Sequence, residues 1–149
     1  PPGPPLFRPL SFMLECWTNE TLEDSEKWTD AGLVREGLHL FKQMSSGRED
    51  DVLLATDLHA GNVLRAEREP WLVIDPKPFL GDRAYDATQH LLNCRGRLSR
   101  DPHGTISRFA DLLEVDPERV RRWTFARAAA EPRREWNNDD LVLLARRLA

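Results

Sequence analysis

The chain has 149 residues, and its 21 Lys and Arg against 25 Asp and Glu give a formal net charge of -4 at pH 7. That charge argues against a nucleic-acid partner, which calls for a basic face. The longest apolar run, Leu141 to Ala145, is far shorter than the roughly 20 residues that span a bilayer. We therefore expect a soluble, cytoplasmic protein of one domain over residues 1–149, without a membrane partner.

The first part of the chain is predicted to be a connector followed by two helices. The proline-rich residues 1–9 show no periodicity, which is typical of an extended connector. A short helix is expected over residues 10–17. Asp30 can cap a longer helix that ends at Gly47, because apolar residues recur there every three or four positions. These residues are Leu33, Val34, Leu38, Phe41 and Met44.

Short apolar runs then replace the helical pattern. Residues 52–55, 62–64 and 71–74 have strand length and are rich in branched or aromatic side chains. Helical periodicity returns at Asp82, and two further N-caps are predicted, Asp116 before Pro117 and Asn138. Helices, a small β-patch and more helices together indicate an α+β fold.

The cysteines and tryptophans are interpreted as structural residues. Cys16 and Cys94 stand in apolar, helix-like segments and are predicted to be buried thiols that do not pair. Aromatic residues at helical spacing are more often core or interface than a carbohydrate-binding platform. Core positions are therefore expected for Trp17, Trp28, Trp71, Trp123 and Trp136.

Polar residues at strand ends form the candidate site. A hairpin that pairs Val63 with Ile74 would place Asn62 opposite Asp75. Asp57 lies five residues before Asn62, so a tight loop could return it to the same rim. Amide and carboxylate oxygens suit Mg²⁺, which keeps waters and takes phosphate oxygens as further ligands. Ordinary turn chemistry at strand ends is the alternative.

The spacing of these residues is the one that kinases use. An Asp, four intervening residues, an Asn and then a strand that ends in a second Asp support phosphoryl transfer there. The runs T-D-L-H-A-G-N-V-L at 56–64, I-D-P-K-P at 74–78 and G-D-R-A-Y-D at 81–86 carry a more specific signal. They resemble the C-terminal lobe of the aminoglycoside and hydroxyurea phosphotransferases, nearest the streptomycin 6-phosphotransferase type.

The resemblance implies a protein-kinase-like C-terminal lobe and a role for several residues. Asp57 would be the catalytic residue that accepts or orients the substrate hydroxyl proton, and Asn62 and Asp75 would hold Mg²⁺ on the phosphates of ATP. Asp86 would support the catalytic loop through backbone hydrogen bonds, and Asp82 would cap the helix that carries it. The family's loop usually begins His-Gly-Asp, whereas this chain has Ala-Thr-Asp at 55–57.

Other contacts are left open by the sequence. His59 and Lys77 are candidate phosphate-binding residues, although His59 could be a solvated loop residue and Lys77 could pair with Asp75 or lie free on the surface. A polycationic aminoglycoside would favour acidic substrate-binding residues. The candidates are Glu135, Asp139 and Asp140, for which helix capping is the alternative.

The resemblance therefore implies an ATP- and Mg²⁺-dependent kinase that phosphorylates a hydroxyl of a small molecule, such as streptomycin, and so confers antibiotic resistance. No glycine-rich G-x-G-x-x-G loop is present, so we expect an N-terminal nucleotide-binding lobe, absent from this chain, before residues 1–9. A non-catalytic lobe remnant or binding module is the alternative. A metal-dependent hydrolase is disfavoured, because the four histidines show no ligand spacing.

Overall fold

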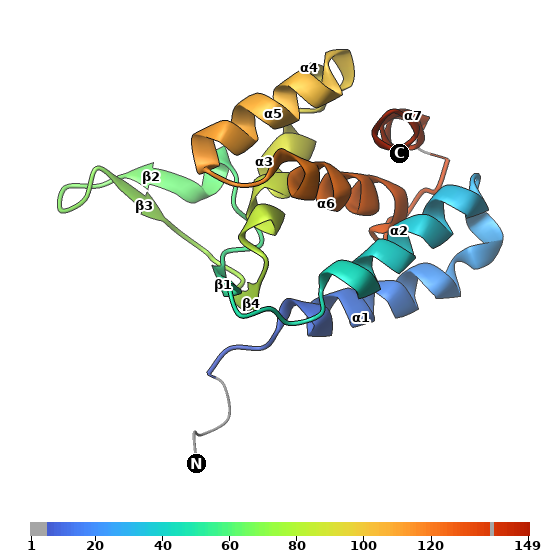
Figure 1. The fold of residues 1–149 in the computed structure, drawn as a ribbon, viewed down its shortest axis with the longest axis horizontal. Coiled ribbons are helices and arrows are strands. Elements are labelled where there is room, and N and C mark those ends of the chain that lie inside the picture. Colours follow the sequence, from blue (N-terminus) through green and yellow to red (C-terminus); the bar gives the residue numbers. More distant parts are fainter. Residues whose placement is uncertain (1–5, 138) are drawn as a thin grey trace.

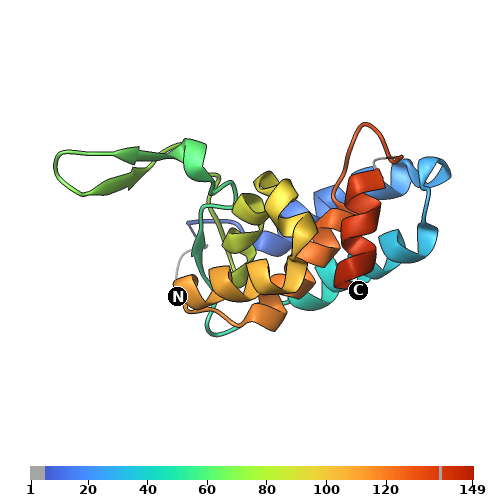
Figure 2. The same ribbon diagram turned by 90° about the horizontal axis from the view of Figure 1, so that it is seen from above.

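The structure, a computed structural model, describes residues 6–137 and 139–149. Helices form the main body, and a two-stranded hairpin projects from one end of it (Figures 1 and 2). Helices with small antiparallel sheets confirm the expected α+β class. In the described residues, no helix has the length and apolar character needed to cross a bilayer.

The helices follow the capping signals of the sequence. Asp30 accepts the N–H of Leu33 at 3.2 Å, and Asp116 accepts the N–H of Glu118 at 2.9 Å, so both predicted N-caps are confirmed. The predicted cap Asn138 lies outside the described residues. The α-helices are α1 (Leu10–Glu23), α2 (Ala31–Met44), α3 (Ala87–Asn93), α4 (Arg95–Arg100), α5 (Pro102–Leu113), α6 (Pro117–Ala130) and α7 (Asp139–Leu148).

Helix α1 extends to Glu23, beyond the predicted 10–17. Its second half is polar and gives no helical pattern of apolar residues, but tertiary contacts stabilise it as helix. The Thr21 hydroxyl is fully buried and donates to the carbonyl of Ala130, at the end of α6, at 2.8 Å. Thr18 returns its hydroxyl to the carbonyl of Leu14, one turn back, at 2.7 Å. These bonds satisfy polar groups that the sequence pattern assigns to solvent.

Helix α6 lies at the centre of the helical body (Figure 1). It packs against α2, α3, α5 and α7, and Trp123 in its middle is fully buried. Gly37 allows α2 to approach α6 closely, since a Cβ at this position would stand 2.8 Å from the Cβ of Ala130. The small side chains of α6 therefore set the distance between the two helices.

The strands form two separate antiparallel pairs. β2 (Val63–Arg65) pairs with β3 (Trp71–Val73), as the hairpin prediction requires. β1 (Val52–Leu54) pairs with β4 (Phe79–Gly81), a strand that the sequence did not predict. Leu80 in β4 also donates its N–H to the carbonyl of Arg8 at 2.9 Å, so the end of the predicted connector runs along this strand.

The predicted register of the hairpin is wrong by one residue. Val63 pairs with Val73 instead of Ile74, and the turn holds residues 66–70. The N–H of Ile74 donates to the carbonyl of Asn62 at 2.9 Å, so Asn62 stands opposite Ile74 and Asp75 follows one position later. Both strands are apolar at every position near their base, and without alternation the pattern cannot fix a register.

The cysteine and tryptophan predictions hold in part. Cys16 and Cys94 are unpaired as expected, but Cys16 is exposed and Cys94 only half-buried, so the prediction of burial is wrong. Cys16 lies on the solvent side of α1, whose buried positions are Leu10, Leu14 and Thr21. Trp123 and Trp136 are buried, and Trp17 and Trp28 pack against the core. Trp71 is the exception, with 66% exposure on the hairpin.

Candidate functional site

The candidate site begins where β1 ends, at the turn that carries Asp57. The N–H of Asp57 donates to the carbonyl of Ala55 at 2.7 Å, and Thr56 between them has a φ of 55°. A hydrogen bond between residues two apart defines a γ-turn, whose positive-φ form is rare and strained. Positive φ costs a β-branched residue on the order of 1–3 kcal/mol, so surrounding contacts must hold this turn.

Asp86 holds the turn from the side of the helical body. Its Oδ2 accepts the N–H of Ala55 at 2.8 Å, and its Oδ1 accepts the N–H of Thr56 at 2.7 Å. The family resemblance implied backbone hydrogen bonds of this kind for Asp86. Burial raises the pKa of Asp86 above its usual value, although both N–H donors and Arg127 oppose that shift.

Asp82 joins this segment to the centre of the fold. It caps the 3₁₀ helix η3 (Arg83–Asp86) by accepting the N–H of Ala84 at 3.1 Å, as predicted. Its Oδ2 accepts the indole N–H of Trp123 at 2.8 Å and Nε of Arg119 at 2.7 Å, both from α6. The turn at Asp57 is therefore tied through η3 to the central helix.

Lys77 ties the same turn to the segment after β3. Its N–H donates to the carbonyl of Ala55 at 3.0 Å, and its carbonyl accepts the hydroxyl of Thr56 at 2.6 Å. Its Nζ donates to Oδ2 of Asp57 at 2.8 Å. This hydrogen bond and the charge of Asp57 raise the pKa of Lys77. The sequence left open whether Lys77 pairs with Asp75. The structure shows that the Lys77 ammonium forms its ion pair with Asp57 instead.

His59 lies beside the same carboxylate. Its Nε2 is 3.8 Å from Oδ1 of Asp57, and its Nδ1 accepts the N–H of Gly61 at 3.1 Å. Because Nδ1 acts as an acceptor, a neutral ring carries its proton on Nε2, the nitrogen nearer Asp57. A ligand that reaches Asp57 would therefore also meet the imidazole.

Asn62 and Asp75, the predicted metal ligands, lie at the base of the hairpin. The Asn62 amide donates to the carbonyl of Asp57 at 2.9 Å, and its Oδ1 accepts no hydrogen bond from the described residues. Asp75 is exposed with a φ of 49°, and within the described chain its carboxylate forms no hydrogen bond or ion pair. The described residues contain no cluster of three or more His, Cys, Asp or Glu that could hold a metal. An amide oxygen and a carboxylate fit Mg²⁺ only where water and phosphate complete its shell.

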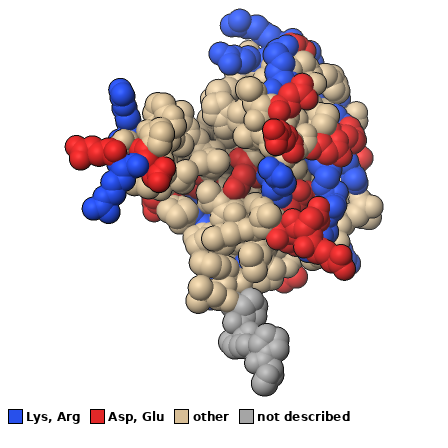
Figure 3. Space-filling model, turned by 60° about the vertical axis from the view of Figure 1, so that its left-hand side comes forward, with Lys and Arg blue, Asp and Glu red and all other residues tan. Residues whose placement is uncertain are grey.

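An apolar groove runs beside the Asp57 turn, between the hairpin and the helical body. The face of the molecule that Figure 3 presents carries its charged side chains mainly at the hairpin tip and over the helices. Within the groove, His90 stacks on Phe109 with ring centroids 4.8 Å apart. The lining residues are Val52, Leu58, His59, Ala60, Val63, Trp71, Arg83, Asp86, His90, Phe109, Leu113 and Val115.

The acidic residues predicted to bind substrate are not brought to this site. Glu135 precedes Trp136, whose indole donates to Asp24 just beyond α1. Asp140 lies in α7, and the side chain of Asp139 lies outside the described residues. Helix α7 and the hairpin stand at opposite ends of the molecule in both ribbon views (Figures 1 and 2).

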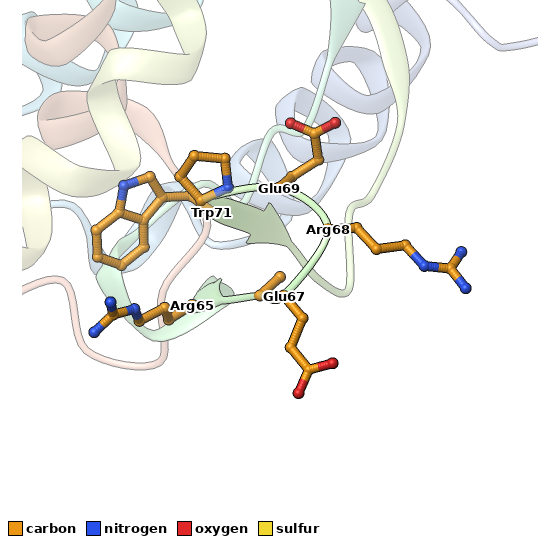
Figure 4. Close-up of a pocket in the computed structure, with 7 residues that line it drawn as sticks. Arg65, Glu67, Arg68, Glu69 and Trp71 are labelled. Carbon is orange, nitrogen blue, oxygen red and sulfur yellow. The ribbon is translucent and has the colours of Figure 1, made fainter.

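A second hollow, at the hairpin tip, has no convergent polar groups among its described residues. It is lined by residues 65–71. Figure 4 shows the side chains of Arg65, Glu67, Arg68 and Glu69 spreading away from one another into solvent. A ligand in this hollow would contact one charged side chain at a time, because these side chains do not converge on a common point.

Two contributors to the site were missed by sequence reasoning. The hydroxyl of Thr56 donates to the carbonyl of Lys77. The only sign of this in the sequence was that Thr56 stands where the family usually has the Gly of His-Gly-Asp. Arg83 lines the groove and donates to the carbonyl of Leu113 at 3.3 Å. Arg83 stands within the run G-D-R-A-Y-D, but no role was predicted for it, since its contact depends on how α5 packs.

Comparisons with known proteins identify a matching family and three relatives. The family described as aminoglycoside/hydroxyurea antibiotic resistance kinase matches residues 1–140. The hydroxyurea phosphotransferase of Kitasatospora aureofaciens is 37% identical over 99 residues, which is 66% of this chain and 28% of that protein. The streptomycin 6-kinases of Streptomyces griseus and Streptomyces glaucescens are 42% and 41% identical over 87 residues, 54% of this chain and 28% of each. No solved structure matches significantly.

The turn that carries Asp57 is fixed by the partly buried carboxylate of Asp86 and lies beside Asn62, and Asp75 follows β3. The chain belongs to the aminoglycoside/hydroxyurea antibiotic resistance kinase family. The matched segment spans 28% of the length of each of these relatives.

Proposed function

We propose that this chain is the kinase-like C-terminal lobe of an ATP-dependent phosphotransferase that moves the γ-phosphoryl group to a hydroxyl of a small molecule. The proposal depends on one observation: Asn62 and Lys77, from separate segments, both donate hydrogen bonds to Asp57, and Ile74, the residue before Asp75, donates its N–H to the carbonyl of Asn62. Family membership supports the reaction class.

In this proposal Asp57 is the catalytic residue. Its Oδ2 is held by Lys77, and its Oδ1 accepts no hydrogen bond within the described chain, which leaves Oδ1 to orient the acceptor hydroxyl and accept its proton. Asn62 and Asp75 would hold Mg²⁺, which supplies charge neutralisation to the phosphates. Phosphoryl transfer depends mainly on such positioning and neutralisation, because its loose transition state needs little covalent help.

The acceptor would bind in the apolar groove beside Asp57. His59 lines this groove and also lies next to the Asp57 carboxylate, so the groove leads to the proposed catalytic group. We propose an antibiotic as acceptor, an aminoglycoside such as streptomycin or the neutral molecule hydroxyurea, after the names of the relatives. The remote position of Glu135 and Asp140 weighs against their role as acceptor contacts.

The nucleotide would require a second segment. No G-x-G-x-x-G run occurs in the sequence to cover the phosphates of ATP. We propose that an N-terminal lobe, joined through residues 1–9, completes the nucleotide site in the parent protein. We also propose a cytoplasmic location, since the proposed co-substrate is ATP.

The experiment is transfer of labelled phosphate from Mg²⁺ and [γ-³²P]ATP to streptomycin or hydroxyurea, by the full-length protein that contains this chain. We expect transfer to at least one acceptor and a loss of about 10³-fold in Asp57→Asn. Asp111→Asn is the matched control, because Asp111 is exposed and its side chain has no bonded partner in the described structure. Full activity in Asp57→Asn would disprove the catalytic role, and inactivity of the parent would favour a binding module.

A further inference from the structure

The contacts of Lys77 indicate a role that neither its sequence position nor the family comparison assigns. Backbone and side chain of this one residue make three hydrogen bonds, to Ala55, Thr56 and Asp57. We propose that Thr56 and Lys77 form a latch that positions the Asp57 carboxylate. The latch rests on the proposed phosphotransferase function, and it makes Lys77 a positioning residue rather than a phosphate ligand.

Thr56 explains half of the latch. A glycine would adopt the φ of 55° without strain, yet this chain places a β-branched residue there. The Thr56 side chain is buried, and its hydroxyl has the carbonyl of Lys77 as its bonded partner. The hydroxyl therefore offsets the strain of the turn by joining it to the segment that carries Asp75. In the family's usual His-Gly-Asp sequence, position 56 has no hydroxyl to make this bond.

The Lys77 ammonium explains the other half. The ammonium donates a hydrogen bond to Oδ2 of Asp57 at 2.8 Å. The negative charge of Asp75 also favours the charged form of Lys77. One carboxylate oxygen is thus fixed and the other is left for a hydroxyl. A lysine that served a phosphate instead would leave Asp57 without a cation, because no other Lys or Arg in the described residues forms an ion pair with it.

Kinetics in the full-length protein separate positioning from phosphate binding. If the latch positions Asp57, Lys77→Met lowers kcat about 10- to 100-fold and leaves the KM for ATP unchanged, and Lys77→Arg recovers part of the rate. Thr56→Val gives the same pattern, and Thr56→Ser, which keeps the hydroxyl, restores the rate. A raised KM for ATP with unchanged kcat in Lys77→Met would overturn the role of Lys77.

A second measurement needs no phosphoryl transfer. Amide hydrogen exchange of the 149-residue chain, followed by NMR, reports whether the turn opens. We expect exchange at Asp57 and Lys77 to be at least about 10-fold faster in Thr56→Val than in Thr56→Ser, while exchange in α6 stays the same and shows that the fold is intact. Equal exchange in the two variants would overturn the latch, even if the parent is an active kinase. Faster exchange in an inactive parent would support the latch and reject the proposed function.

Discussion

Asp86 shows how a single, partly buried carboxylate can hold the conformation of a strained turn. Both of its oxygens accept backbone N–H groups, from Ala55 and Thr56. An amide in its place offers one acceptor and one donor, so one of the two N–H groups would face a second donor. Leaving such a buried group unsatisfied costs about 1–3 kcal/mol.

Asp86→Asn is therefore expected to lower the free energy of unfolding by about 1–3 kcal/mol, measured by urea denaturation. The effect should depend on pH. Because burial raises the pKa of Asp86, the folded chain binds more protons than the unfolded chain just above the ordinary Asp pKa of about 3.9. The stability that Asp86 contributes is therefore greatest below that value and falls as the pH rises through the raised pKa.

The comparison of wild type with Asp86→Asn isolates this effect from the exposed acids. The advantage of the wild type should shrink as the pH rises above about 4 and then level off. Asp111→Asn, which changes an exposed Asp on α5, should show no such trend. An advantage that grows with pH would show that the N–H donors, and not burial, dominate the ionisation of Asp86.

At the scale of elements, the crossing of α2 and α6 depends on the absence of a side chain at Gly37. A Cβ there would lie 2.8 Å from the Cβ of Ala130 and 3.0 Å from the Cβ of Ala129. Gly37→Ala improves helix propensity by up to about 1 kcal/mol, but it forces the helices apart. Overpacking costs about 1–3 kcal/mol, so a net loss of stability is expected.

Gly32→Ala in the same helix is the matched control. Its added Cβ would meet only Oδ1 of Asp30, at 3.5 Å, which is an ordinary contact. Thermal unfolding should therefore show a lower Tm for Gly37→Ala and an equal or higher Tm for Gly32→Ala. A raised Tm in Gly37→Ala would mean that the two helices can separate without cost.

The elements that the sequence predicted best are those with local signals. Asp30 and Asp116 are caps that bond to backbone groups two or three residues away, so their helices could be predicted without knowledge of the fold. β4 is a strand only because it pairs with β1, 25 or more residues earlier in the chain (Leu54 with Phe79). The hairpin register likewise depends on a turn that a uniformly apolar pattern does not specify.

The candidate site divides in the same way. The closeness of Asn62 to Asp57 could be predicted, because a short loop joins them and the Asn62 amide donates to the carbonyl of Asp57. The ion pair of Lys77 with Asp57 could not be predicted, because it depends on the γ-turn at Thr56. A positive φ at a threonine has no sequence signature. The substrate acids were inferred from charge alone, and charge does not say at which end of the molecule a helix lies.

At the scale of the whole molecule, the arrangement of charge limits what this chain can bind by itself. Asp57 and Asp75 present negative charge where a triphosphate would arrive, and the nearest lysine, Lys77, is already paired. Mg²⁺ would relieve part of the repulsion, but two protein oxygens form only a partial shell. In the proposed function, contacts with the base and the first two phosphates come from the proposed N-terminal lobe.

We therefore expect the chain alone to bind Mg²⁺·ATP with a Kd no tighter than about 1 mM, measured by isothermal titration calorimetry. A ligand at a concentration equal to its Kd stabilises the folded state by only about 0.4 kcal/mol, so 1 mM nucleotide should barely move the Tm. In the full-length protein the same titration should give a much lower Kd, and Asp75→Asn should weaken that binding only when Mg²⁺ is present. Micromolar affinity in the chain alone would show that the hairpin and the Asp57 turn already form a complete nucleotide site.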